Sequence, residues 1–456
     1  DVALDPELLG RVFKNLLASF NPETSTTARK ATGSYYTPRP IVDYMADESL
    51  KAYFKNKLGE IENINRKLEE LFSYGMDKHS FNKEETKKLV QAIDKIRIID
   101  PAVGSGAFPM GILQRLVYLL SKLDPDNKIW RQLQKEKILQ KFSGALDIKD
   151  KKEREKALKE IDNVFERNTS DYGRKLYLIQ NCIYGVDIQP IAIQIAKLRF
   201  FISLLVDMNS DDIKPLPNLD FKFVAANSLI PAPETEQKGS LFGSDEFFIK
   251  LQANIEKYFY LSDYKEKNKA KKAIENLIDE RIKEKTNHIK DQIHSLPTPS
   301  GNVIKKVNNE AVNKKDRLIE LWKSYKNIFS QDKEVGFFET KYFFPNIKDG
   351  FDIVIGNPPY IQLQKNGGEL ANLYKNVGYE IFDRMSDIYT LFYERGLQLA
   401  KQDFGLLCYI TSNKWMRAGY GEKLRGFFAK KNPIKLLDFG GFKVFKSATV
   451  DTNILI

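Results

Sequence analysis

Short apolar runs alternate with longer amphipathic stretches along most of the chain. The short runs are rich in β-branched residues and end at Gly, Pro, Asp or Asn, which is the pattern of buried strands. The longer stretches repeat apolar residues every three or four positions, as helices do. Strands are predicted at residues 96–100, 182–187, 221–229, 351–356, 405–411, 434–440 and 449–456. Because helical segments separate most of these strands, the sequence predicts an α/β fold with a doubly wound, mostly parallel sheet.

The same pattern divides the chain into four parts. Residues 1–50 are an N-terminal helical segment, residues 51–230 hold the first strands among helical insertions, and residues 336–456 hold the remaining strands. Between them, residues 231–335 are rich in Lys and Glu and helical in pattern. From 251 to 330 there are 17 Lys and Arg against 11 Asp and Glu. This insertion is either an arm that faces nucleic acid or a helical hairpin whose charges are simply solvated.

Composition narrows the class of protein. With 456 residues, 42% hydrophobic and 29% charged, the chain is a large globular protein rather than a disordered or collagen-like one. Two cysteines are too few for a disulfide framework or a four-ligand zinc site, so we expect no structural metal and a reducing cytosol. No apolar stretch reaches about 18 residues, so we expect a soluble protein without membrane contact. A net charge of +11 favours a polyanionic partner, although a generally basic surface would give the same value.

A glycine-rich turn follows the first predicted strand. In IIDPAVGSGAF the strand ends at Asp100, and Gly104 and Gly106 let the backbone approach a ligand before a helix begins. A dinucleotide fingerprint would need another glycine at position 109, which is Pro109, and the sequence has no Walker-type phosphate loop. Asp187 ends the second strand, where a carboxylate can accept hydrogen bonds from both hydroxyls of a ribose. A glycine turn alone is as often structural as functional, but the combination predicts a pocket for one unphosphorylated nucleoside.

The turn Asn357-Pro358-Pro359-Tyr360 follows the apolar run FDIVIG, at the carboxyl end of a predicted strand. Proline removes a backbone donor and fixes φ, so the Pro358 carbonyl and the Asn357 side-chain carbonyl form two fixed acceptors. Two such acceptors can hold an NH2 group on a planar ring or amide and draw its nitrogen toward a tetrahedral, nucleophilic geometry. Tyr360 can stack on the planar group. The turn therefore predicts chemistry on a planar amino group.

This chemistry needs no strong general base, because the amine becomes acidic only after it has attacked an electrophile. The histidines agree with that expectation, since none of them lies beside these motifs: His79, His288 and His294. Neither Cys182 nor Cys408 follows a proline or lies in a glycine-rich turn, so a nucleophilic cysteine is not indicated.

Three motifs in this order, GSYYTP (33–38), DPAVGSGAF (100–108) and NPPY (357–360), resemble those of the amino-methylating DNA methyltransferases. The order is that of the gamma class of N6-adenine enzymes, in the form found in the methylase part of type IIG restriction-modification proteins. The resemblance extends over nearly the whole chain. It implies a Rossmann-like class I methyltransferase fold, S-adenosylmethionine as cofactor, and duplex DNA as partner, with the target adenine flipped out of the helix. It also implies a bacterial or archaeal cytoplasmic protein associated with the nucleoid.

The resemblance further implies a role for individual residues. The motif for the methionine end of the cofactor is matched by Tyr36, Thr37 and Pro38, and the cofactor turn by Asp100, Ala102, Gly104 and Gly106. The ribose and adenine contacts are matched by Asp187, Ile188, Asn227 and Ser228, although Asn227 replaces the acidic residue often found there. The catalytic motif is matched by Asn357, Pro358, Pro359 and Tyr360. Phe445 matches the aromatic residue that stacks on the other face of the target base from Tyr360, with Phe442 as the alternative.

Other planar amino groups remain alternatives: N4 of cytosine, an RNA base, or a protein glutamine. N4-cytosine enzymes more often have Ser where this chain has Asn357, and glutamine enzymes are expected to lack GSYYTP. A catalytically silent DNA-binding relative is a further alternative. Because the chain begins with Asp and ends in a predicted strand, we expect a fragment of a longer protein. Its target-recognition domain would follow Ile456 and any nuclease would precede Asp1 or be on a partner subunit, so we expect weak, poorly specific DNA binding.

Overall fold

The computed structural model describes residues 37–76, 78–141, 171–206, 217–233, 243–261, 263–294, 302–445 and 450–456. Residues 1–36 of the predicted N-terminal helical segment, which include Tyr36, lie outside these ranges. No helix in the described part of the chain is long and apolar enough to cross a membrane.

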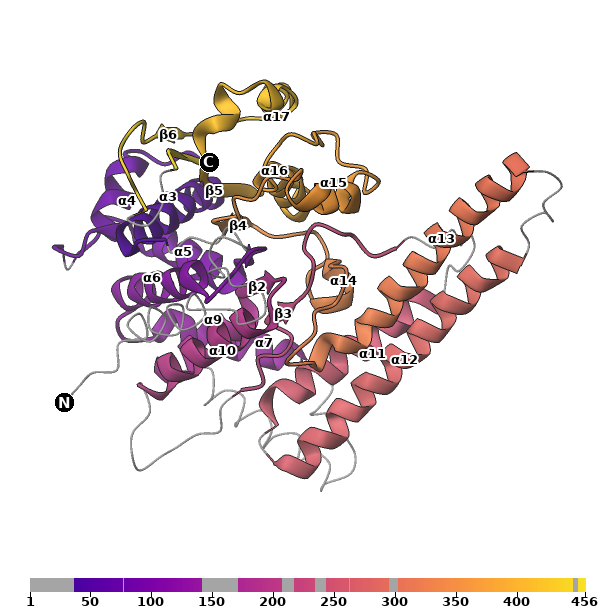
Figure 1. The fold of residues 1–456 in the computed structure, drawn as a ribbon. Coiled ribbons are helices and arrows are strands. Elements are labelled where there is room, and N and C mark those ends of the chain that lie inside the picture. Colours follow the sequence, from indigo (N-terminus) through magenta and orange to yellow (C-terminus); the bar gives the residue numbers. More distant parts are fainter. Residues whose placement is uncertain are drawn as a thin grey trace.

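The strands of these residues form one seven-stranded sheet in the order β3-β2-β1-β4-β5-β7-β6 (Figure 1). Their bounds are β1 (Ile98–Asp100), β2 (Ile183–Asp187), β3 (Phe223–Ala225), β4 (Ile353–Gly356), β5 (Leu406–Ser412), β6 (Leu436–Asp438) and β7 (Thr452–Leu455). Each coincides with a strand predicted from the sequence. The first five pair in parallel, whereas β7 runs antiparallel to both β5 and β6. The predicted doubly wound, mostly parallel sheet is therefore confirmed.

Helices cover both faces of this sheet, and the strands are accordingly apolar on both sides. Ile98 on β1 belongs to one buried core, while the next residue, Ile99, belongs to the other. The first core is covered by α3 (Arg39–Leu58), α4 (Ile64–Phe72), α5 (Lys83–Lys95), α6 (Ala107–Leu123), α7 (Lys128–Lys141), α9 (Asp171–Asn181) and α10 (Pro190–Leu205). The second is covered by α14 (Thr340–Phe343), α15 (Glu369–Tyr374), α16 (Tyr389–Leu399), α17 (Glu422–Phe428) and the helices of the insertion.

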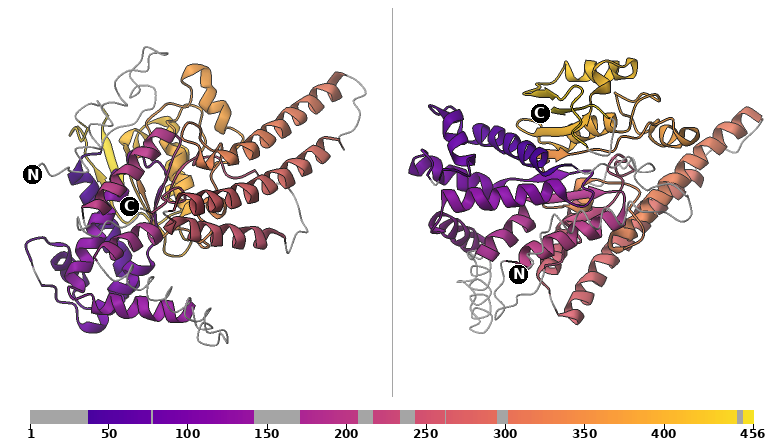
Figure 2. Two further views of the ribbon diagram at one scale, coloured as in Figure 1. Left: turned by 90° about the horizontal axis from the view of Figure 1, so that it is seen from below. Right: turned by 60° about the vertical axis from the view of Figure 1, so that its left-hand side comes forward.

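The described residues of the basic stretch between β3 and β4 include three α-helices: α11 (Gly243–Tyr260), α12 (Tyr264–His294) and α13 (Asn302–Ser324). Helices α12 and α13 lie side by side and project well beyond the sheet in every view (Figures 1 and 2). At the base of this pair, the Trp322 ring packs on Phe337 and Tyr342 at centroid distances of 5.3 and 5.4 Å. The boundaries proposed for the four parts of the chain remain predictions.

The strand order reverses between β1 and β4, because the chain proceeds from β1 to β2 and β3 on one side and from β4 to β5 on the other. In open α/β sheets the carboxyl ends of the strands at such a switch point form the ligand-binding crevice. Asp100 ends β1, and Asn357 directly follows β4. The topology therefore brings the glycine-rich turn and the NPPY turn to the same place.

Candidate functional site

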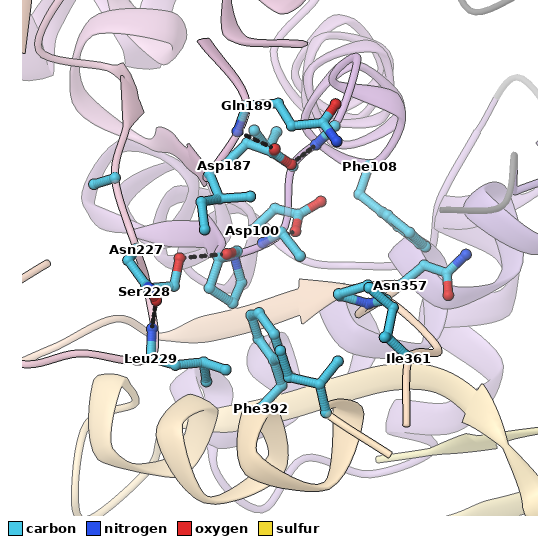
Figure 3. Close-up of a pocket in the computed structure, with 18 of the residues that line it drawn as sticks. Asp100, Phe108, Asp187, Gln189, Asn227, Ser228, Leu229, Asn357, Ile361 and Phe392 are labelled. Atoms are coloured by element: carbon cyan, nitrogen blue, oxygen red, sulfur yellow. Dashed lines mark hydrogen bonds between the residues drawn. The ribbon is translucent and has the colours of Figure 1, made fainter. Parts of the chain in front are cut away.

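A cavity of about 280 Å³ lies at this switch point (Figure 3). Many of the predicted site residues line it: Thr37, Asp100, Ala102, Gly104, Asp187, Ile188, Asn227, Ser228, Asn357 and Pro359. Five others lie outside its wall: Pro38, Gly106, Pro358, Tyr360 and Phe445. The loops after four neighbouring strands thus contribute to one pocket, together with Thr37, which lies two residues before α3.

The two glycines of the turn act differently. Gly104 adopts φ of 51° and donates its backbone N–H to Asp187 Oδ2 at 2.8 Å. Gly106 adopts φ of 82° immediately before α6, and a Cβ there would meet Ala196 Cβ on α10 at 3.3 Å. Both positions favour glycine because their φ is positive. Gly104 shapes the wall of the cavity, whereas Gly106 sets the turn and allows α6 to approach α10.

Two carboxylates lie in the wall. Asp187 is fixed by its own Oδ1, which accepts a hydrogen bond from the Gln189 backbone N–H at 2.9 Å, in addition to the bond from Gly104. Asp100 is fully buried, and its Oδ1 accepts a hydrogen bond from the Ala102 backbone N–H at 3.0 Å. Burial raises the pKa of Asp100 well above its usual value; the Ala102 amide opposes that rise, and the negative charge of Asp187 adds to it.

The cavity wall contains no lysine, arginine or histidine among the described residues that form it. The charged side chains of that wall are therefore the two carboxylates, Asp100 and Asp187. A ligand that carries positive charge would gain from this arrangement, because unlike charges attract strongly at a site largely removed from water. An anionic ligand such as a nucleotide phosphate would be repelled.

Gly356, the last residue of β4, was not predicted as a site residue. A Cβ at this position would lie 2.6 Å from Asp100 Oδ1 and 3.3 Å from Asp100 Cγ. Such contacts do not occur in folded proteins, so only glycine lets the carboxylate lie against β4. The sequence gives no local signal for this requirement, because the two residues belong to strands far apart in the chain.

The polar atoms of the β3 loop are bonded within the protein. Ser228 donates its hydroxyl to the Pro101 carbonyl at 2.6 Å, and Asn227 Oδ1 accepts the Leu229 backbone N–H at 3.1 Å. Arg395 on α16 supports the same loop, since its Nε donates to the Ser228 carbonyl at 2.9 Å and its Nη2 to Phe338 at 2.7 Å. Sequence reasoning missed Arg395, because its partners lie 167 and 57 residues away.

The NPPY turn joins the cavity through Asn357, whose Nδ2 donates a hydrogen bond to Thr37 Oγ1 at 3.1 Å. Tyr360 lies farther along and donates its hydroxyl to the Ile410 carbonyl at 3.2 Å. The Tyr360 ring faces the Phe445 ring at a centroid distance of 6.3 Å and an interplanar angle of 62°. Phe445 is only 2% exposed, whereas the alternative, Phe442, is 70% exposed. Phe445 is therefore the aromatic residue that contacts Tyr360.

Exposed cations occur on several loops at the carboxyl ends of the strands and nearby. They belong to the loops that follow β4 and β5 and to the connection between β6 and β7: Lys365, Arg384, Lys414, Arg417 and Lys443. Lys414 and Lys365 lie near enough to the Asp387 carboxyl to oppose the rise in its pKa that burial causes. Asp387 precedes Ile388, a residue of the cavity wall, so both lysines act on a carboxyl group next to that wall. The pocket wall thus holds carboxylates, and the exposed cations of the neighbouring loops are called the basic rim below.

The Asp, Glu, His and Cys residues of the described ranges form no cluster of three or more that could hold a metal ion. The two cysteines are buried, and burial raises the pKa of each thiol to about 12.

Comparison with known proteins gives several relatives. A Methanocaldococcus jannaschii protein whose name describes a type II restriction enzyme and methyltransferase is 27% identical across the whole of this chain, which spans 38% of that relative's length. The Escherichia coli type II restriction enzyme and methyltransferase Eco57I is 36% identical over 23% of this chain and 11% of its own length. A type II methyltransferase of Pseudomonas aeruginosa is 36% identical over 19% of this chain and 15% of its length. Residues 181–445, more than half of the chain, match the Eco57I restriction-modification methylases, and the chain belongs to that family.

Proposed function

We propose that this chain transfers a methyl group from S-adenosylmethionine to the N6 amino group of an adenine flipped out of duplex DNA, as the modification part of a restriction-modification system. One observation carries the proposal. Asn357 of the NPPY turn lines the same cavity as Asp100 and Asp187. A nucleoside cofactor beside the carboxylates and an amino group beside Asn357 would therefore meet within one pocket.

The chemistry of the pocket fits S-adenosylmethionine. The cofactor supplies an electrophilic methyl group on a positively charged sulfur and carries an ammonium group as well. The carboxylates of Asp100 and Asp187 would offset these positive charges, and Asp187 can also accept hydrogen bonds from the ribose hydroxyls. Ile188, half-exposed in the cavity wall, offers an apolar surface to the adenine ring.

The target amino group would be held by Asn357 Oδ1 and the Pro358 carbonyl. Both are acceptors, so together they favour the nitrogen geometry that develops as it attacks the methyl group. The proton leaves the nitrogen only after the new N–C bond has formed, which is why no strong base is needed. Catalysis then depends on positioning and on fixed dipoles.

The rings of Tyr360 and Phe445 must move apart before a base can stack between them. A base between two parallel rings needs roughly 7 Å between their planes, about twice the ordinary stacking distance. The Tyr360 and Phe445 rings are only 6.3 Å apart at their centroids and are tilted by 62°. We therefore propose that entry of the adenine displaces Phe445 and turns the two rings toward parallel.

The basic rim supports duplex DNA as the partner. Phosphates attract exposed Lys and Arg over distances of about 10 Å at moderate salt. Lys365 and Lys414 act on Asp387, which adjoins the cavity wall, and are therefore candidates to contact the DNA from which the base is flipped. An acidic protein partner would be attracted in the same way. Methylation of a glutamine side chain in such a partner, however, would not require a base to be flipped out.

Two measurements test the proposal. Titration calorimetry with S-adenosylmethionine should give saturable binding that Asp187→Ala removes. Incubation with methylation-free DNA and labelled cofactor, followed by digestion to nucleosides and mass spectrometry, should yield N6-methyladenine. Asn357→Ala should abolish product while cofactor affinity stays nearly the same. Detection of N4-methylcytosine would show that the target is cytosine rather than adenine. Absence of both cofactor binding and methylated bases would refute the proposal.

A further inference from the structure

Thr37 joins two motifs that the resemblance treats as separate. It lies in the motif matched to the cofactor's methionine end, yet its hydroxyl accepts a hydrogen bond from the side chain of Asn357 at 3.1 Å. The two residues are 320 positions apart in the sequence. Thr37 is 4% exposed and lies in the cavity wall. Its immediate neighbour in the structure is therefore the residue proposed to hold the target amine.

The hydroxyl is presented from a rigid element. Thr37 lies next to Pro38, the N-cap of α3, and the Pro38 carbonyl accepts hydrogen bonds from the Ile41 and Val42 amides in the first turn of that helix. Farther along α3, Asp47 pairs with Arg115 of α6 in a largely buried salt bridge. At Gly111 of α6 a Cβ would meet Val42 Cγ1 at 2.5 Å, so the two helices are in close contact. Thr37 has little freedom to move away from β4.

The direction of the hydrogen bond matters for the amide. Asn357 Nδ2 is the donor to Thr37, which directs Oδ1 away from that hydroxyl. A target amino group also donates, so it can be held by Oδ1 but not by Nδ2. The Thr37 hydroxyl can donate as well as accept, so it holds the position of the amide, and the target amino group, which only donates, selects the orientation with Oδ1 toward it.

We propose that Thr37 is a positioning residue for methyl transfer, whose hydroxyl holds the amide of Asn357 in the place where it would meet the target nitrogen. This inference rests on the proposed function. A positioning role and a cofactor contact have different effects. Loss of the position of Asn357 lowers the rate of the chemical step, whereas loss of a cofactor contact lowers the affinity for S-adenosylmethionine. Misplacement of a reacting group by about 1 Å can cost about 100-fold in rate.

The test uses the intact protein and two substitutions of Thr37. Thr37→Val keeps the shape and removes the hydroxyl, and Thr37→Ser keeps the hydroxyl. Thr86→Val on α5 is the matched control, because Thr86 is equally buried and its hydroxyl donates to the Asn82 carbonyl at 2.7 Å, away from the cavity. For each variant, kcat at saturating DNA and cofactor, the Kd for S-adenosylmethionine and the Tm are measured.

We expect Thr37→Val to lower kcat by about 100-fold with the cofactor Kd within about twofold of the unaltered protein. Thr37→Ser should recover most of the rate, and Thr86→Val should retain it. If Thr37→Val does not fold, Thr37→Ala removes the same hydroxyl and takes its place.

Other results overturn the inference. An unchanged kcat would show that the Thr37 hydroxyl is not needed to position Asn357. A higher Kd for the cofactor, with or without a lower kcat, would make Thr37 a cofactor contact. Both leave the proposed function intact as long as the unaltered protein methylates DNA. If the unaltered protein binds no cofactor and methylates nothing, the proposed function fails and the inference fails with it.

Discussion

Gly356→Ala is predicted to damage the pocket through a single added methyl group. The new Cβ would lie 2.6 Å from Asp100 Oδ1, and an ordinary contact begins at 3.4 Å, so the carboxylate or the strand must shift by about 0.8 Å. Asp100 cannot shift freely, because it is fully buried and its Oδ1 accepts the Ala102 N–H at 3.0 Å. The β4 backbone cannot shift freely either, since it pairs with both β1 and β5.

The cost follows from these two constraints. Overpacking a core by one methyl group typically costs about 1–3 kcal/mol, and strain on a hydrogen bond to a carboxylate adds to it. We expect Gly356→Ala to lower the free energy of unfolding by about 2–4 kcal/mol. Cofactor binding should weaken as well, because any shift of the Asp100 carboxyl group changes the wall of the pocket.

The assay is thermal unfolding with and without S-adenosylmethionine, and Gly426→Ala is the matched control. Gly426 is inside α17, and a Cβ there would meet nothing within 4 Å, so the same substitution should be neutral or stabilise by up to about 1 kcal/mol. In an Asp100→Ala background the clash is absent, and Gly356→Ala should then cost little. If Gly356→Ala and Gly426→Ala unfold at the same temperature, the reasoning about this contact is wrong.

Three further predictions follow from the pocket and its rim. Asp100→Asn should stabilise the unliganded protein by on the order of 2 kcal/mol at neutral pH while weakening cofactor binding. Because the pKa of Asp100 is raised in the folded state, the wild type loses stability as the pH rises from the ordinary Asp range toward that pKa. The stability advantage of Asp100→Asn should therefore fade as the pH is lowered to about 4. An advantage that persists at that pH contradicts a raised pKa for Asp100. Lys414→Ala should reduce the magnitude of the slope of log K against log salt concentration for DNA binding by about 1. The control Lys87→Ala on α5 should leave the slope unchanged. Equal slopes for the two variants would exclude a phosphate contact at Lys414. Arg395→Met should cost about 2–4 kcal/mol in urea unfolding, since it leaves the buried Ser228 and Phe338 carbonyls without this donor, and an unchanged unfolding midpoint would refute that role.

Local sequence signals predicted the elements that depend on local chemistry. Each strand was visible as a short apolar run that ends at a turn residue, and Asp100, Asp187 and Asn357 were visible because they directly follow such runs. The parallel arrangement then brings strand ends together without further information. For this reason most residues of the predicted pocket do line one cavity.

The interactions that complete the site could not be predicted in this way. The Gly356–Asp100 contact, the support of Ser228 by Arg395 and the Thr37–Asn357 hydrogen bond each join residues more than 160 positions apart. Periodicity and turn chemistry act over a few residues, so they contain no signal for such pairs. The tilt between Tyr360 and Phe445 likewise depends on how separate loops pack rather than on either motif.

The position of β4 at the centre of the sheet has a consequence for biosynthesis. Its register partner for Ile353 is Ile98 on β1, and the whole helical insertion separates the two. A ribosome that adds 5–20 residues per second needs on the order of tens of seconds to produce that intervening chain. During this time the nascent β1 has an unpaired edge beside β2, and such edges can recruit other chains. Synthesis of the long insertion therefore lengthens the interval in which this edge of β1 is unpaired, and a translational pause before β4 would lengthen it further.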